Sequence, residues 1–110
     1  MAGCVVTKEF VVPLENAPGS LADALAAAQA AGARIVALAT ETRGEFGLAR
    51  IVADPEAAAR RGLHAAGLHP HENDALLVLT SDAGGALARL AASGVDVRAS
   101  YFAGGALAVV

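Results

Sequence analysis

Aromatic and sulfur-containing residues are scarce in this 110-residue chain. It has no tryptophan, one tyrosine, three phenylalanines, one methionine and a single cysteine, Cys4. A lone cysteine excludes an intramolecular disulfide, and a chain without a disulfide framework is typical of a reducing compartment. No cluster of basic side chains surrounds Cys4 in the sequence, so a reactive thiol is not indicated. We therefore expect a cytoplasmic protein.

Charge is also sparse. Charged residues make up 17% of the chain and the net charge is −3. No basic stripe with interleaved aromatic residues occurs, which argues against nucleic-acid binding. The apolar runs are interrupted by charge or glycine well before the ~20 residues that a membrane helix needs. The start of the chain lacks the charged and apolar regions of a signal peptide. Neither a nucleic acid nor a membrane is an expected partner.

Residues that carry chemistry do not gather into a known signature. The sequence contains no phosphate-binding or dinucleotide fingerprint and no nucleophile–base pattern, so no catalytic residue and no cofactor is expected. His69 and His71 flank Pro70, with His64 and Glu72 nearby, and could in principle bind a metal. Because a metal site needs three or four converging ligands, a solvated linker is the favoured interpretation and no metal is expected.

What the chain does have is apolar residues, which make up 55% of it. The order of patterns predicts a strand over 8–14, a helix over 20–31, a strand hairpin over 33–42 and 46–53, and a helix from Asp54-Pro55 to 66. Ser20 is the expected cap of the first helix and Asp54 that of the second. Leu21, Ala24, Leu25 and Ala28 form the apolar stripe of the first helix.

After an extended linker at 68–72 the pattern begins again. Strands are expected over 74–80, 95–102 and 105–110, with a short helix over 85–92. The turn Asn16-Ala17-Pro18-Gly19-Ser20-Leu21 has a shortened counterpart at 82–87. Gly19 to Gly32 spans thirteen positions and Gly85 to Gly94 nine, a difference of four, or about one helical turn. The sequence thus predicts a βαββαβ copy over 1–72, followed by a shortened βαββ copy over 73–110 without its last helix and strand.

The first copy resembles the ACT-domain family. The resemblance rests on the stretches 14–22, 31–35 and 46–58, which match the family's first turn, its second strand start, and its third strand with the following helix. It implies an α+β, ferredoxin-like fold, with antiparallel sheets and helices on one face. Members bind amino acids or related small ligands, usually to regulate metabolic enzymes. The chain looks like a shortened form of the tandem members of this family.

The resemblance also implies a binding site between copies. The turn would present backbone N–H groups and a helix N-terminus to a ligand carboxylate. The candidate ligand-binding residues are Asn16, Ala17, Pro18, Gly19, Ser20, Leu21, Arg34, Asp82 and Asp96. Many members have asparagine where this chain has Arg34 and Asp96. These two could clamp the carboxylate and ammonium groups of an amino acid, could pair with each other, or could face solvent.

Three functions remain open at this stage. The leading hypothesis is a regulatory module that binds an amino acid, has no catalytic activity, forms homo-oligomers and acts on a metabolic enzyme. The alternative is a ligand-free assembly module, because an incomplete second copy leaves a sheet edge or a bare face that another chain can cover. A small ferredoxin-like enzyme is the third, since a fold does not fix a function.

Overall fold

The computed structural model describes residues 3–15, 19–43, 45–103 and 105–110. Along these residues the elements are β1 (Cys4–Glu15), α1 (Ser20–Ala30), β2 (Arg34–Arg43), β3 (Phe46–Asp54), α2 (Glu56–Ala65), β4 (His71–Leu79), α3 (Ala83–Ala92), β5 (Ser100–Ala103) and β6 (Ala106–Val109). The longest of the described helices has 11 residues, and none is long and apolar enough to cross a membrane.

The described strands form one antiparallel sheet in the order β2-β3-β1-β4-β6-β5. β1 is long because it has two partners: Glu9–Glu15 pair with β3, and Cys4–Val11 pair with β4. Alternate residues of a strand face opposite sides of the sheet, so the register places the side chains that contact α1, α2 and α3 on one face. The predicted α+β class, with antiparallel pairing and helices on one face, is confirmed.

β4 joins the two predicted copies. It lies beside β1 as the fourth strand of the first copy, and with α3, β5 and β6 it also begins the second copy. The expected linker at 68–72 and strand at 74–80 are therefore largely one strand. The N-terminal half of β1 takes the place beside β4 that a full second copy would fill with a strand of its own. The division at residue 72 stays a prediction, and β4 crosses it.

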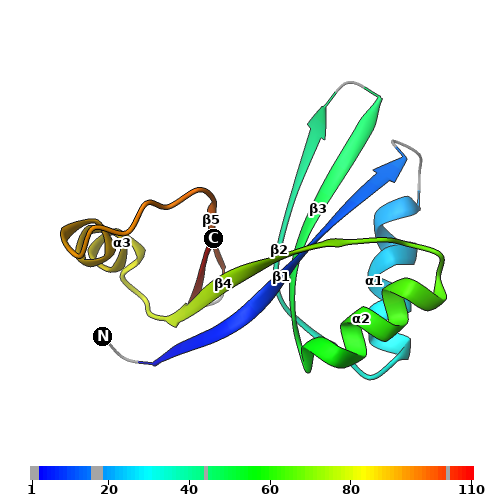
Figure 1. The fold of residues 1–110 in the computed structure, drawn as a ribbon, viewed down its shortest axis with the longest axis horizontal. Helices are drawn as coiled ribbons and strands as arrows, with labels where there is room; N and C mark the ends of the chain where they lie inside the picture. The colour runs from blue at the N-terminus through cyan, green and yellow to red at the C-terminus, as the bar shows by residue number, and fades with distance from the viewer. Residues whose placement is uncertain (1–2, 16–18, 44, 104) are drawn as a thin grey trace.

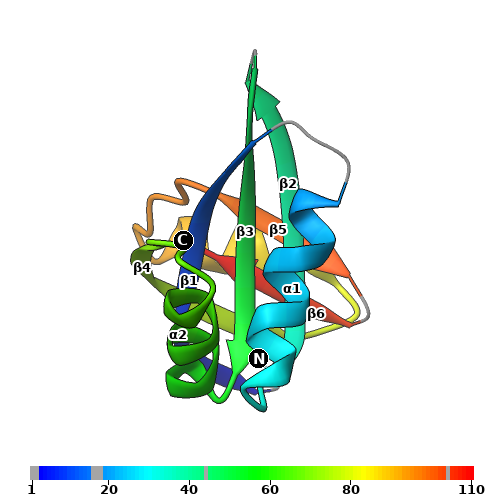
Figure 2. The same ribbon diagram turned by 90° about the vertical axis from the view of Figure 1, so that its right-hand side faces the viewer.

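The sheet bends so that its two ends lie face to face. In Figure 1, α1 and α2 lie to the right, α3 to the left, and the strands between them. Figure 2 shows β5 and β6 crossing behind the upright strands β1–β3. The inner faces pack through Ala37 and Val52 on one half and Ala108, Leu77 and Tyr101 on the other. The result is a helix–sheet–sheet–helix arrangement, in which edge strands β2 and β5 touch.

Three local predictions need correction. α1 is capped by Gly19, with φ 89°, and Ser20 is its first helical residue. Pro55 precedes α2 with an extended ψ of 146°, because Asp54 is still paired with Arg34 in the sheet. The strand expected over 95–102 is shorter, since Val95 donates its N–H to Leu90 at the end of α3.

Gly62 allows α1 and α2 to approach closely above the first half of the sheet. The two helices cover a core centred on Phe10, Ile51 and Leu63, each fully buried. A Cβ at Gly62 would lie 2.3 Å from the Ala27 carbonyl oxygen, which is backbone and cannot move without shifting α1. A glycine inside a helix normally weakens it, so close packing is the reason for this one.

We expect Gly62→Ala to destabilise the protein by about 1–3 kcal/mol, because overpacking outweighs the better helix propensity of alanine. Urea unfolding measures the change. Gly84→Ala in α3 is the matched control: its Cβ would meet the Asp82 carboxylate only at 4.0 Å, so we expect equal or slightly greater stability. A Gly62→Ala variant as stable as the parent would contradict the close approach.

A second prediction concerns the stability of the protein at low pH. Arg60 of α2 donates two hydrogen bonds to Glu72 of β4, from Nε at 2.8 Å and from Nη2 at 2.6 Å. These bonds hold the pKa of the Glu72 carboxyl below its usual 4.5. A carboxyl with a lowered folded-state pKa contributes stability above its unfolded pKa and loses it as pH falls through the folded one. We expect Glu72→Gln to reduce the loss of stability below about pH 4.5.

Urea unfolding at a series of pH values measures this effect, with Glu45→Gln at the exposed β2–β3 turn as the control. If the stability of Glu72→Gln fell with pH as steeply as that of the parent, the Arg60–Glu72 pair would not contribute to the loss of stability in acid.

Candidate functional site

The first predicted binding turn is described only in part. Asn16, Ala17 and Pro18 lie outside the described residues. Gly19 is exposed and adopts the left-handed conformation, and its carbonyl accepts the N–H of Asp23 at 2.8 Å. Ser20 and Leu21 form the start of α1, where Ser20 is half-buried and Leu21 packs against the first core.

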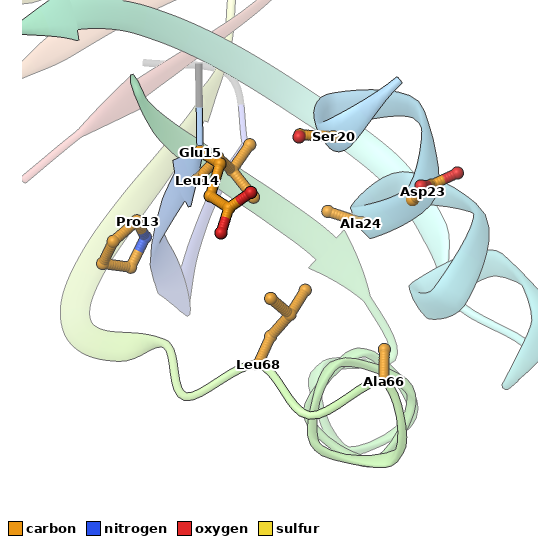
Figure 3. A pocket seen from close by; sticks show the side chains of 8 residues that line it. All are labelled: Pro13, Leu14, Glu15, Ser20, Asp23, Ala24, Ala66 and Leu68. Carbon is orange, nitrogen blue, oxygen red and sulfur yellow. The ribbon is translucent and has the colours of Figure 1, made fainter. Parts of the chain in front are cut away.

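A cavity of about 410 Å³ lies beside this helix start. Its apolar walls are Leu14, Ala24 and Leu68, between the end of β1, α1 and the segment after α2 (Figure 3). Two carboxylates, those of Glu15 and Asp23, also line it, and Glu15 points toward the space between β1 and α1. This negative charge opposes the positive end of the helix, which makes the cavity a poor match for a ligand carboxylate.

The second predicted turn uses its acidic side chain for structure. The Asp82 carboxylate accepts the Gly85 N–H at 3.0 Å and caps α3, while its own N–H bonds to Thr80 Oγ1. A Cβ at Gly85 would lie 2.2 Å from Asp82 Oδ2, so the glycine leaves room for this cap. The ligand role of Asp82 remains a prediction, and its carboxylate already occupies the place that a bound anion would take.

Arg34 and Asp96 lie in different surroundings. Arg34 opens β2 at the far end of α1 from Gly19, a separation of roughly 16 Å along an 11-residue helix. Its Nη2 lies 3.9 Å from Oδ2 of Asp54. Asp96 is exposed in the segment between α3 and β5. In the described parts of the chain no ion pair joins Arg34 to Asp96. The acidic neighbour of Arg34 is Asp54.

Arg34 stands at the rim of a larger cavity of about 460 Å³ between the two halves of the sheet. Both predicted copies contribute to it: β2 and β3 from the first, and β4 and β6 from the second. Apolar side chains dominate its lining, namely Val5, Val36, Val52, Leu77, Leu79 and Ala106. A concave, mostly apolar space with a few polar groups at its edge is the usual form of a small-molecule site.

The Arg34–Asp54 pair supplies that polar edge. Their side chains are 76% and 72% exposed, so at 3.9 Å the pair contributes little to stability and either group can turn to a ligand. Asp54 was interpreted from the sequence as a helix cap and was missed as a candidate. Only the register of the β2–β3 hairpin, which sets Arg34 opposite Asp54, could have indicated it.

A buried polar network lies between the same two halves of the sheet. The Glu9 side chain is fully buried, and Arg50 Nη1 donates to its two oxygens at 3.0 and 3.2 Å. Asn73 Nδ2 donates to Oε1 at 3.0 Å, and Tyr101 OH to Oε2 at 3.0 Å. β1, β3, β4 and β5 thus meet at one carboxylate. Burial, together with the nearby Glu9 charge, raises the pKa of Tyr101, which keeps its hydroxyl protonated as a donor.

The histidines do not assemble a metal site. The rings of His64 and His69 lie 6.3 Å apart, and His71 begins β4. Among the residues that the structure describes, no three His, Cys, Asp or Glu side chains are placed to hold a metal ion.

We expect Tyr101→Phe to cost about 1 kcal/mol, because it removes one hydrogen bond to a buried carboxylate while keeping the ring. Glu9→Gln should cost more, since it removes the charge that faces Arg50. Urea unfolding measures both, with the exposed Ser100→Ala in the same strand as the control. A Tyr101→Phe variant with full stability would mean that the bond between the sheet halves contributes nothing.

The chain matches no family model and no curated protein. Solved structures do match. Protein BT0572 from Bacteroides thetaiotaomicron has a TM-score of 0.79 at 20% identity, over 97% of this chain and 80% of that one. The ligand-free regulatory subunit of aspartate kinase from Thermus thermophilus has a TM-score of 0.67 at 11% identity, and the match covers 98% of this chain and 85% of that one. The corresponding subunit from Thermus flavus has a TM-score of 0.60 at 12% identity, and the match covers 98% of this chain and 86% of that one.

At these identities the matches show the fold. They span nearly the whole chain, including the junction at β4, so the likeness extends to the arrangement of the two halves. Regulatory subunits of aspartate kinase are built from ACT domains. The resemblance to the ACT-domain family that the sequence indicates is therefore confirmed at the level of the fold.

Proposed function

We propose that this chain is a regulatory module that binds an amino acid with an apolar side chain, without catalysis of its own. The observation that carries the proposal is the 460 Å³ cavity between the sheet halves, with Arg34 and Asp54 at its rim. Its place between the two predicted copies is where the resemblance puts the ligand of a tandem protein. The copies are taken as residues 1–72 and 73–110, with β4 shared at the boundary.

The chemistry of the cavity fits such a ligand. Arg34 offers a planar guanidinium for the ligand carboxylate, and Asp54 offers a carboxylate for the ammonium group. The ligand would replace a weak, exposed ion pair with two charge-assisted bonds. Its side chain would enter the lining formed by Val36, Val52 and Leu77, where burial of apolar surface adds affinity. Of the predicted residues, Arg34 thus keeps its role, and Asp54 replaces Asp96 as its acidic partner.

The regulatory role is supported by the solved structures with this fold. Two of them are regulatory subunits of aspartate kinase, one of them in a ligand-free form. By analogy we propose that this chain acts in the cytoplasm as a homo-oligomer and controls a metabolic enzyme.

Assembly without a ligand is the second candidate. Within the described residues, Cys4–Lys8 pair with β4 on one side only, which leaves a free strand edge. Val6 on this edge is 80% exposed, and no helix of a complete second copy covers it. An exposed apolar edge of this kind invites pairing with another chain. The ligand test below separates the two candidates, because a pure assembly module responds to no amino acid.

We expect leucine, isoleucine or valine to raise the melting temperature, and serine or glutamate not to do so at the same concentration. A ligand at 100 times its dissociation constant adds about 2.7 kcal/mol to stability. Arg34→Met and Asp54→Asn should each remove the shift, because each deletes one half of the charge clamp. Arg89→Met, at an exposed position of α3, is the matched control and should keep it. No shift from any of the twenty amino acids at millimolar concentration would refute the proposal.

A further inference from the structure

A second hollow lies at the opposite end of the contact between the two sheet halves. There β2, which stands upright in Figure 2, touches β5, which crosses behind it. Two adjoining spaces of about 330 and 190 Å³ share Arg50, Arg98 and Ala99 in their lining. We call them together the seam cleft. Besides the two arginines, Glu41 of β2 and Tyr101 of β5 line it, so this cleft is more polar than the cavity at Arg34.

The floor of the seam cleft is rigidly built. Arg50 reaches Glu9 with Nη1, and Glu9 is itself fixed by Asn73 and Tyr101. Nη2 of Arg50 donates to no side chain in the described part of the molecule. The Glu41 carboxylate lies 3.6 Å from Arg50 Nε and also lines the cleft. Arg50 is thus oriented from below and keeps a donor edge toward the open space, with 26% of its side chain exposed.

Arg98 supplies a second guanidinium to the same space. It lines both parts of the cleft, is exposed, and forms no ion pair or side-chain hydrogen bond with a described residue. Glu9 and Glu41 both lie against Arg50, whereas Arg98 pairs with neither of them and keeps its donors for a ligand. Two guanidinium groups that converge on one hollow favour an anion between them, and a planar carboxylate matches their donor geometry.

We propose that the seam cleft binds the carboxylate of a small polar metabolite between Arg98 and Arg50, as a site separate from the cavity at Arg34. Its size suits a ligand of a few carbon atoms. Glu41 disfavours further negative charge, so a monocarboxylate should bind better than a dicarboxylate.

The full chain is titrated with L-lactate, acetate and succinate, and binding is followed by NMR chemical-shift changes, with sodium chloride at equal ionic strength as the reference. We expect saturable shifts at β2 and β5, stronger with the monocarboxylates L-lactate and acetate than with succinate. Arg98→Ala should weaken binding at least tenfold, and Arg98→Lys should weaken it too, because a lysine cannot form the two parallel bonds. Arg89→Ala is the matched control and should bind as the parent does.

Arg50 is not the residue to substitute, because its loss would leave Glu9 buried without its cation. The proposal would be overturned if none of the three carboxylates caused saturable shifts larger than those caused by sodium chloride. An unchanged affinity in Arg98→Ala would also overturn it. The two sites can be told apart in the same sample: Arg98→Ala should leave any leucine-induced shift at Val36 and Leu77 intact, and Arg34→Met should leave the lactate response intact.

Discussion

The buried carboxylate of Glu9 is the constraint on which the arrangement of this molecule depends. A charge that is removed from water must be paired and hydrogen-bonded, or it costs several kcal/mol. β1 cannot satisfy Glu9 by itself. Arg50 from β3, Asn73 from β4 and Tyr101 from β5 do so together. The tyrosine comes from the far end of the sheet, so the sheet must bend to bring β5 across β2 and β3.

That bend creates the candidate sites. Face-to-face packing through Ala37, Val52 and Ala108 closes the middle of the contact between the halves, and the ends stay open. At one end the apolar cavity has Arg34 and Asp54 at its rim. At the other the polar seam cleft has Arg98 and Arg50, with Glu41 beside them. The same fold thus offers two hollows of contrasting chemistry, one suited to an apolar amino acid and one to a small carboxylate.

Sharing of β4 explains how the predicted second copy can fold although it is shortened. A complete copy needs a strand on each side of its first strand, and here β6 lies on one side and the N-terminal half of β1 on the other. The missing strand is therefore supplied by the first copy. The missing helix is not replaced within the described residues, which leaves Val6 exposed. This bare edge is the part of the surface best suited to contact another chain.

The sequence by itself determined the local structure, because apolar periodicity, turn residues and glycine stops act over a few residues. From these signals α1, the β2–β3 hairpin, α3 and the ACT-like fold could be predicted. Only the tertiary structure decided that β4 serves both halves, that Glu9 is the buried centre, and that Arg34 meets Asp54 and not Asp96. Those outcomes depend on strand register and on the bend of the sheet, which arise from contacts between residues as far apart as Glu9 and Tyr101.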